Sequence, residues 1–503
     1  MADSGELVLA IDQGTSSTKA ITTDVSGALL SRASAPLSQS HPRPGWVEQD
    51  AEELFASVIS AAQQATAHNS AQLGAIALSS QRESAVAWDA RTGEPLGPVL
   101  GWQDRRTADA AAALRVAGNT AWVREASGLP IDPMFSALKF AWLLDDVDPG
   151  RQRSRAGKIA IGTVDSWIMF RLTGEHRIEV GNASRTQLLN LETADWDSEL
   201  LELFGIPRAC LPRVVSSVEH SDVVVGIPGL RAELRVCAVM GDSHAALYGH
   251  GVRAPGAVKV TYGTGSSVMG LLPAGRSSGD GLVRTIAWGT SEAPAHAFEG
   301  NILSAGSTIT WLAELLNDSP EELARLAETA SGSGSIFFVP AFSGLGSPWW
   351  DDKAEAAISG LNLGTSRADL ARAAFESIPL QVEDILAAAD DAAGARISTI
   401  LADGGPSANP WLMQLQADLS QRLVAPADVA ELSAAGAARM AGVSAAIWSD
   451  DDNRALSDSG PSFTPATNPD YAADRRAGWL AAVARSRHER DRNHRPLSAT
   501  APL

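Results

Sequence analysis

The N-terminal stretch Leu7–Ala20, with the sequence LVLAIDQGTSSTKA, constrains the fold more than any other part of the chain. Its apolar run, Leu7–Ile11, has the length of one buried β-strand and ends abruptly at Asp12 and Gly14. A carboxylate therefore lies at the end of a buried strand, and the glycine permits a tight turn close to a ligand. The hydroxyl groups that follow, together with Lys19, suit phosphate binding.

This turn has two interpretations. Asp12 alone would repel a polyphosphate, but Mg²⁺ removes the conflict because hard cations bind carboxylate and phosphate oxygens together. The stretch thus predicts a turn that binds a metal–nucleotide complex. It has neither the Walker pattern G-x-x-x-x-G-K-[ST] nor the dinucleotide pattern G-x-G-x-x-G. The alternative is an ordinary hairpin turn rich in Ser and Thr.

Length and charge narrow the class of protein. A chain of 503 residues is expected to form two or three domains. The net charge of −19 argues against nucleic acid or an anionic membrane surface as the main partner. Cys210 and Cys237 offer neither a disulfide framework nor a CxxC spacing, which favours a reducing compartment. With no signal-peptide pattern and no apolar run of about eighteen residues, a soluble cytoplasmic protein is expected.

Polar residues also follow other predicted strands of the first half. The strand Leu73–Ser79 ends near Arg82 and Glu83, and the edge where strands end is where open α/β sheets place ligands. The alternative for this pair is a solvated surface ion pair. A second strand-end carboxylate, Asp242, follows the apolar residues that begin at Val236.

Two further glycine turns lie in the second half. Predicted strands Ala257–Tyr262 and Ser267–Leu272 enclose the first turn, whose glycines let backbone N–H groups approach an anion. The second turn, DGGPS, leads into a predicted helix over Pro410–Leu419, as suits phosphate or adenosine. Further helices are predicted over Ala51–Thr66 and Ile302–Leu316.

The three turns DQGTSST, YGTGSS and DGGPSAN together are similar to those of the actin and hexokinase superfamily. Other stretches narrow the resemblance to the FGGY carbohydrate kinases, specifically the glycerol kinase branch, over about residues 6–480. These stretches are PGWVEQD at 44–50, SSQRES at 79–84, WQDRRTA at 102–108, GLPIDPMFSALK at 128–139, GTVDSWI at 162–168, NASRTQLLN at 182–190, GDSHAALYG at 241–249 and FSGLGSPWWD at 342–351.

The resemblance implies an α/β fold of two ribonuclease-H-like domains, of the actin/hexokinase type, facing each other across an interdomain cleft. Residues 1–250 would form the substrate-binding domain with the first phosphate hairpin. Residues 251–484 would form the nucleotide-binding domain, with the boundary near 248–256, and 485–503 a disordered tail.

The resemblance also implies ATP-dependent phosphorylation of a primary hydroxyl of a small polyol or sugar. Asp242 would be the general base and Asp12 would hold Mg²⁺. The nucleotide-binding residues would be Thr15, Ser16, Ser17, Lys19, Gly263, Thr264, Gly265, Gly306, Thr310, Gly405 and Asn409. Lys19 stands where the glycerol kinase pattern has Arg, so a bidentate phosphate contact becomes a point charge. Thr310 stands where the pattern has Gln, so the amide contact of the pattern is not expected here.

The substrate site departs further from the glycerol kinase pattern. Four glycerol-contacting positions match the pattern: Arg82, Glu83, Trp102 and Asp242. The other three predicted substrate-binding residues are Met134, Ser243 and Ser267. Met134, Ser243 and Ser267 replace Tyr, Gln and Phe of the pattern. The smaller groups favour a wider pocket for a tetritol, pentitol or ketopentose; the alternative is that neighbouring side chains fill the space and glycerol remains the substrate.

Two other functions stay open. One is a ketopentose kinase of the xylulose or ribulose type, and the other is a nucleotide-driven switch or filament on the same superfold. A filament has no reason to carry the substrate residues named above, so a metabolic kinase is favoured. The sequence leaves the oligomeric state open, with a homodimer or a homotetramer as candidates.

Overall fold

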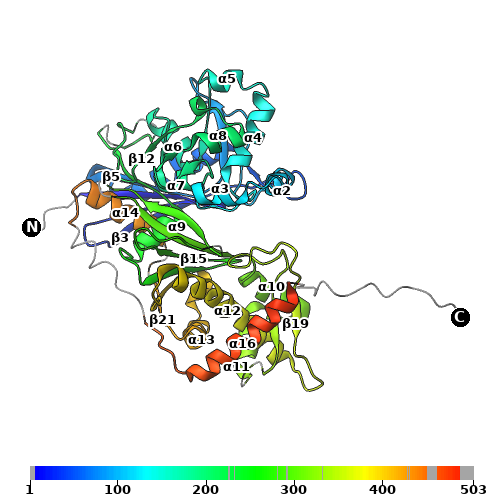
Figure 1. The fold of residues 1–503 in the computed structure, drawn as a ribbon. Coiled ribbons are helices and arrows are strands. Elements are labelled where there is room, and N and C mark those ends of the chain that lie inside the picture. The colour runs from blue at the N-terminus through cyan, green and yellow to red at the C-terminus, as the bar shows by residue number, and fades with distance from the viewer. Residues whose placement is uncertain are drawn as a thin grey trace, which may run out of the picture.

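The structure is a computed structural model that describes residues 6–487 except 225–226, 231–232, 280, 291–292, 331, 333, 428, 430 and 450–460. Figure 1 shows two lobes, the upper one built from the N-terminal half and the lower one from most of the C-terminal half. Each lobe is built around one large mixed β-sheet. The sheets and the helices between their strands show that the fold belongs to the α/β class.

The sheet of the first lobe has the strand order β13-β5-β1-β2-β3. Its members are β1 (Leu7–Gln13), β2 (Ser17–Thr23), β3 (Leu29–Pro36), β5 (Leu73–Ser80) and β13 (Val236–Gly241). The first three strands form an antiparallel meander, whereas β5 and β13 run parallel to β1. The carboxyl ends of β1, β5 and β13 therefore meet at one edge, where Asp12, Arg82 and Asp242 follow.

Helix α1 (Ala51–Thr66) has the predicted bounds and packs its apolar face on this sheet. Asp50 begins the helix by accepting a hydrogen bond from the Glu53 N–H. The other strands of the lobe are β4 (Glu48–Gln49), β6 (Ala85–Asp89), β7 (Val99–Leu100), β8 (Ile159–Thr163), β9 (Arg177–Glu179), β10 (Leu189–Asn190), β11 (Asp195–Trp196) and β12 (Arg213–Val215). The other helices are η1 (Ser70–Gln72), α2 (Ala108–Val116), α3 (Thr120–Ser127), α4 (Ser136–Val147), α5 (Gln152–Arg155), α6 (Val164–Thr173), α7 (Val180–Ser184), α8 (Ser198–Phe204), η2 (Arg208–Cys210) and α9 (Asp242–Gly249).

The sheet of the second lobe has the order β16-β17-β15-β14-β20-β21. Its strands are β14 (Ala257–Tyr262), β15 (Ser266–Leu271), β16 (Val283–Trp288), β17 (Ala295–Ile302), β20 (Thr399–Asp403) and β21 (Leu423–Pro426), with β18 (Phe337–Val339) and β19 (Ala357–Ser359) forming a separate pair. The helices in this half of the chain are α10 (Gly306–Leu316), α11 (Pro320–Thr329), α12 (Arg367–Ala393), η3 (Gly405–Ala408), α13 (Pro410–Ser420), α14 (Leu432–Ser444) and α16 (Pro469–Ser486).

Two predictions for the second half are wrong in their bounds. The helix predicted from Ile302 begins at Gly306, because Ile302 pairs with Ser266 as the last residue of β17. The first two residues of the tail predicted over 485–503 are helical instead, because α16 continues to Ser486; residues 488–503 lie outside the described part of the chain. In the described residues, no helix is both long and apolar enough to cross a bilayer.

Helix α14 departs from the expected division of the chain. It follows the second sheet in sequence but packs on β1, β5 and β13 of the first sheet, and Figure 1 shows it in orange among the elements of the upper lobe. Its closest neighbour is α9, where Gly436 lies against the backbone of Ala245 and Gly249. An apolar cluster that includes α9 and α14 extends from the first sheet to Met269 of the second. These two helices therefore join the lobes.

We predict that Gly436→Ala lowers the free energy of unfolding by about 2 kcal/mol, because overpacked sites of this kind typically cost about 1–3 kcal/mol. A Cβ at this position would lie 1.8 Å from the Ala245 carbonyl oxygen, so the two helices must separate. Urea unfolding measures the change. The matched control is Gly150→Ala, whose new Cβ would lie 3.8 Å from its nearest neighbour and should change stability by less than about 0.5 kcal/mol. Equal stability of the two variants would contradict the prediction.

Candidate active site

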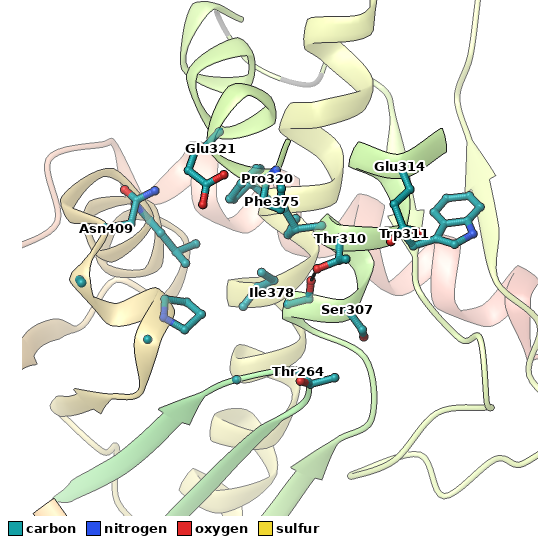
Figure 2. A pocket seen from close by; sticks show the side chains of 18 residues that line it. Thr264, Ser307, Thr310, Trp311, Glu314, Pro320, Glu321, Phe375, Ile378 and Asn409 are labelled. Carbon is teal, nitrogen blue, oxygen red and sulfur yellow. Dashed lines mark hydrogen bonds between the residues drawn. The ribbon is translucent and has the colours of Figure 1, made fainter. Parts of the chain in front are cut away.

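A cavity of about 920 Å³ lies in the second lobe between α10, α11, α12 and the turn before α13 (Figure 2). The structure brings six predicted nucleotide-binding residues together around it: Gly263, Thr264, Gly306, Thr310, Gly405 and Asn409. Its volume is within the range of small-molecule sites, about 300–1,000 Å³. We refer to it as the first cavity.

Backbone contacts fix the hairpin that borders the first cavity. The Gly306 N–H donates to the Gly263 carbonyl oxygen at 2.9 Å, and the Ser307 N–H donates to the Thr264 carbonyl oxygen at 3.0 Å. A Cβ on Gly265 would lie 2.4 Å from the Ile302 carbonyl oxygen, and one on Gly306 would lie 2.6 Å from that of Gly263. Glycine is therefore needed at both positions for the hairpin to reach the start of α10.

The remaining lining of the first cavity suits a nucleoside. Ile309, Phe375, Ile378 and Leu412 are apolar and can contact a flat base, whereas Ser307 offers a hydroxyl group. Figure 2 shows Phe375 and Ile378 on α12 facing the space from the side opposite Asn409. Sequence reasoning missed these lining residues, since their apolar character equally predicts a buried helix face.

Thr310 and Asn409, two of the predicted nucleotide-binding residues, form hydrogen bonds within the protein. The Thr310 hydroxyl donates to the Gly306 carbonyl oxygen of its own helix at 3.2 Å. The Asn409 side chain caps α13 by accepting hydrogen bonds from the Trp411 and Leu412 N–H groups. Asn409 thus fixes the start of α13 at the cavity wall.

A second cavity, of about 770 Å³, reaches the strand ends of the first lobe. It is lined by Asp12, Lys19, Asp242 and Ser243, and it shares Gly405 with the first cavity. Asp12, Lys19 and Asp242 therefore line a cavity that meets the first cavity at the glycine turn after β20. This arrangement places the candidate metal ligand and one candidate phosphate-binding residue in the same cavity as the candidate base.

Asp12 can take part in holding a divalent cation. Its carboxylate accepts a hydrogen bond from the Ser79 hydroxyl, and burial raises its pKa to about 6 although that bond opposes the shift. Asp12 also lines the second cavity. One such carboxylate with substrate phosphates is a usual arrangement for Mg²⁺, so the residues present fit this ion.

The first hairpin turn is closed by the Gly14 N–H, which donates to the Ser17 carbonyl oxygen at 3.0 Å. The Thr15 hydroxyl oxygen accepts a hydrogen bond from the Trp102 indole N–H at 3.0 Å, and Ser16 is exposed. Lys19 forms an ion pair with Glu431 at 2.9 Å. Thr15, Ser16 and Ser17 line neither cavity, unlike Lys19.

Asp242 is the first residue of α9 and directly follows β13. Its Oδ1 lies 3.2 Å from the Nε atom of Arg82, and 38% of its side chain is exposed. Desolvation raises the pKa of Asp242 although the charge of Arg82 opposes the shift. The carboxylate is thus accessible and a stronger base than a free aspartate.

Arg82 and Glu83 are buried, with 9% and 5% exposure, so the interpretation as a solvated surface pair is wrong. Glu83 has a φ of 62°, in the left-handed region that few residues other than glycine adopt. Its carboxylate accepts a hydrogen bond from Arg185 Nε at 2.6 Å. Such a backbone outlier persists only where its surroundings hold it in place.

The three positions that depart from the glycerol kinase pattern differ in their surroundings. Met134 packs against Leu129, Phe135 and Val283, and Trp350 packs against the same small cluster from the loop between β18 and β19. Ser267 on β15 has a buried hydroxyl without a hydrogen-bond partner among the described residues. The Ser243 N–H donates to Asp242 Oδ1 at 2.6 Å.

Lys139 ties two parts of the substrate site together. Its ammonium group is buried and donates to the carbonyl oxygens of Glu83, at 3.1 Å, and of Met134. Burial lowers the pKa of Lys139 to about 8, although the charge of Glu83 opposes the shift. Lys139 therefore fixes the backbone of two candidate substrate residues.

Sequence reasoning missed four charged residues at the site: Arg185, Lys259, Glu299 and Glu431. Arg185 lies within the NASRTQLLN stretch but received no role, and Glu299 is a single charge inside the otherwise uncharged strand β17. The position of Glu299 inside a strand could have predicted a buried ion pair, because a buried charge requires a partner.

Family comparisons agree with this geometry. The sequence model described as "FGGY family of carbohydrate kinases, N-terminal domain" matches residues 7–249, and the corresponding C-terminal model matches residues 258–445. The chain therefore belongs to the FGGY family of carbohydrate kinases. It is an ATP-dependent kinase of a carbohydrate or polyol, and a nucleotide-driven filament or switch does not fit this membership.

Within the family, the chain is similar to glycerol kinases. It is 43% identical over 451 residues to a glycerol kinase of Citrifermentans bemidjiense, covering 88% of this chain and 91% of that relative. An apulose kinase of Pectobacterium atrosepticum is 40% identical over 488 residues, covering 96% and 98% of the two chains. The solved structure of Plasmodium falciparum glycerol kinase with ADP has a TM-score of 0.91 at 28% identity, covering 96% of this chain and 98% of that one. The predicted family and the predicted fold of two facing actin/hexokinase-type domains are confirmed.

We predict a pH-dependent stability effect at Lys139. Between about pH 8 and its ordinary pKa of 10.5, Lys139 binds fewer protons in the folded state than in the unfolded state. The stability of the wild type relative to Lys139→Met should therefore rise with pH across this range, by at most about 1.4 kcal/mol per pH unit. Urea unfolding of both proteins at several pH values measures the difference. A difference that stays constant or falls between pH 8 and 10 would contradict the prediction.

Proposed function

We propose that the protein transfers the γ-phosphate of ATP to a primary hydroxyl group of a small polyol or sugar, with Asp242 as general base. The observation that carries this proposal is the position of Asp242. Asp242 lines the second cavity together with Asp12 and Lys19, and its accessible carboxylate pairs with Arg82.

The chemistry needs a base at this point. An alcohol is a poor nucleophile near neutral pH, so a carboxylate within hydrogen-bonding distance must take its proton as the bond to phosphorus forms. The raised pKa of Asp242 improves it as an acceptor for this proton. Arg82 and Glu83 would bind the remaining hydroxyl groups, and Trp102 would form an apolar wall.

The negative charge of the ATP phosphates would be neutralised by a Mg²⁺ ion held by Asp12 and by the ammonium group of Lys19. Asp12 would hold Mg²⁺, which supplies positive charge to the phosphate oxygens. Lys19 would contribute a mobile charge, and the hairpin around Thr264 would supply backbone N–H groups from the second lobe. The first cavity would hold the adenosine part.

We propose a substrate larger than glycerol, namely a tetritol, pentitol or ketopentose. The unpartnered hydroxyl of Ser267 supports this proposal, because a longer chain of hydroxyl groups could pair with it. In contrast, Met134 and Trp350 pack against the same small apolar cluster, which supports partial filling of the space that the Tyr of the pattern would occupy. Relatives named glycerol kinase and apulose kinase have comparable identity to this chain, so overall similarity does not select between a polyol and a ketopentose kinase.

We further propose a cytoplasmic location, which the two free, buried cysteines Cys210 and Cys237 support. For assembly, the homodimer and the homotetramer remain the two proposed states. Light scattering of the purified protein distinguishes them by mass.

We predict that Asp242→Asn lowers kcat by about 10²–10⁴-fold, because it keeps the shape of the side chain but removes the base. ATP binding should survive, since Asp242 lies outside the first cavity. Coupled ADP-release assays and calorimetry measure the two effects. The matched control is Asp145→Asn, a 69% exposed carboxylate of α4, which should leave kcat unchanged. Near-wild-type turnover of Asp242→Asn would remove this residue from the role of base.

The second prediction tests the wider pocket. Restoring both rings with Ser267→Phe and Met134→Tyr should raise kcat/KM for glycerol by about 10–200-fold and lower it for the best longer substrate. A screen of glycerol, tetritols, pentitols and ketopentoses first identifies that substrate. The control Ser267→Ala removes only the hydroxyl and should weaken the longer substrate alone. A wild-type preference for glycerol would show that neighbouring side chains have filled the pocket.

A further inference from the structure

Glu299 is a fully buried carboxylate in β17 of the second sheet. It accepts two hydrogen bonds from the Arg82 guanidinium group, at 2.7 Å to Oε1 and 3.2 Å to Oε2. Its Oε2 also lies 2.8 Å from the Nη2 atom of Arg185. Both arginines belong to the first lobe, so Glu299 reaches across the interface between the sheets.

The two arginines carry this contact on to the candidate substrate residues. The Nε atom of Arg82 lies 3.2 Å from Asp242 Oδ1, and the Nε atom of Arg185 lies 2.6 Å from Glu83 Oε1. The charges therefore alternate along a line from Asp242 through Arg82, Glu299 and Arg185 to Glu83. Glu299 stands at the centre of this line and is the only member from the second lobe.

The central charge limits where Arg82 can turn. Without Glu299, the guanidinium group would lose its bidentate partner and could rotate fully onto Asp242, where it would occupy the base. Burial raises the pKa of Glu299, but the charges of Arg185 and Arg82 outweigh burial and hold the pKa below its usual value. The carboxylate is thus charged and can bind both arginines at once.

Stability alone gives little reason for this arrangement. Well-packed apolar residues of similar volume are often as stabilising as a buried ionic cluster. In the sheet, Glu299 pairs with Met269 of β15 and with Val283 of β16, which are both apolar. A charge at this position is better explained by the orientation of Arg82 and Arg185 than by packing.

We infer that Glu299 is a positioning residue of the kinase, which orients Arg82 and, through Arg185, Glu83 toward the acceptor substrate without touching it. This inference rests on the proposed roles of Asp242 and Arg82. It makes the orientation of two first-lobe residues, Arg82 and Glu83, depend on a carboxylate of the second lobe, so the acceptor site is complete only when the two sheets are correctly placed relative to each other.

The test is Glu299→Gln, which keeps the shape of the side chain and removes its charge. We expect kcat/KM for the best polyol or sugar to fall about 10²-fold, as displacement of positioning groups typically does. The KM for ATP should stay within about twofold, since Glu299 lines neither cavity. A wild-type kcat/KM for the acceptor would overturn the inference.

The matched control is Glu376→Gln in α12. Glu376 is also fully buried and also pairs with two arginines, Arg372 and Arg475, but it lines neither cavity. It should lower the melting temperature as Glu299→Gln does and leave the acceptor KM within about twofold of the wild type. An equal loss of acceptor affinity in both variants would show a general folding effect and overturn the inference.

A double-mutant cycle with Arg82→Lys separates positioning from independent contributions. Because Glu299 acts partly through Arg82 and partly through Arg185, the double variant should be less impaired than the product of the two single losses. Fully additive losses would overturn the inference. If Glu299→Gln fails to fold, Glu299→Asp retains the charge but is one methylene shorter, and it should raise the acceptor KM severalfold; an unchanged KM in this variant would also overturn the inference.

The outcome separates this inference from the proposed function. If Asp242→Asn is inactive while Glu299→Gln is normal, only the role of Glu299 falls. If Asp242→Asn has normal turnover, the proposed role of Asp242 as general base is contradicted, whatever the result for Glu299→Gln.

Discussion

The site depends on the neutralisation of buried charge where the two sheets meet. Arg82 and Arg185 come from the first lobe, and the carboxylate that joins them, Glu299, comes from the second. Breaking a buried pair leaves an uncompensated charge, which is far more costly than the pair itself. The alignment of the lobes is therefore coupled to the chemistry. The register of β17 matters in particular, since a slip of one residue would turn Glu299 to the opposite face of its sheet.

The sequence predicted those parts of the structure whose signals are local. The buried strand that ends at Asp12, the helix Ala51–Thr66 and the glycine hairpin before Ser267 all depend on residues close in sequence. Local patterns did not predict which distant segments contact each other; only the family resemblance grouped distant residues into candidate sites. Arg82 and Glu299 are 217 residues apart, and no local pattern selects one buried partner over another.

The wrong start of the helix predicted from Ile302 has a related cause. The residues from Ala295 to Leu316 include two apolar runs, and only the pairing of β17 with β15 and β16 separates the strand from α10. Similarly, α14 is rich in alanine and glycine and would suit either lobe; the close approach of Gly436 to α9 decides its place. Tertiary packing, not propensity, sets these boundaries.

The position of α14 also bears on the order in which the chain can fold during synthesis. The first sheet consists of residues 7–241, but α14, which packs on β1, β5 and β13, begins at Leu432. A nascent chain that has just completed β13 would expose apolar side chains such as Val8, Ala10 and Ala75 that the finished protein buries in the cluster around α14. Domains of many proteins fold one after another as they leave the ribosome. Here the first lobe reaches its final packing only after most of the second lobe has been made, so the two lobes mature together.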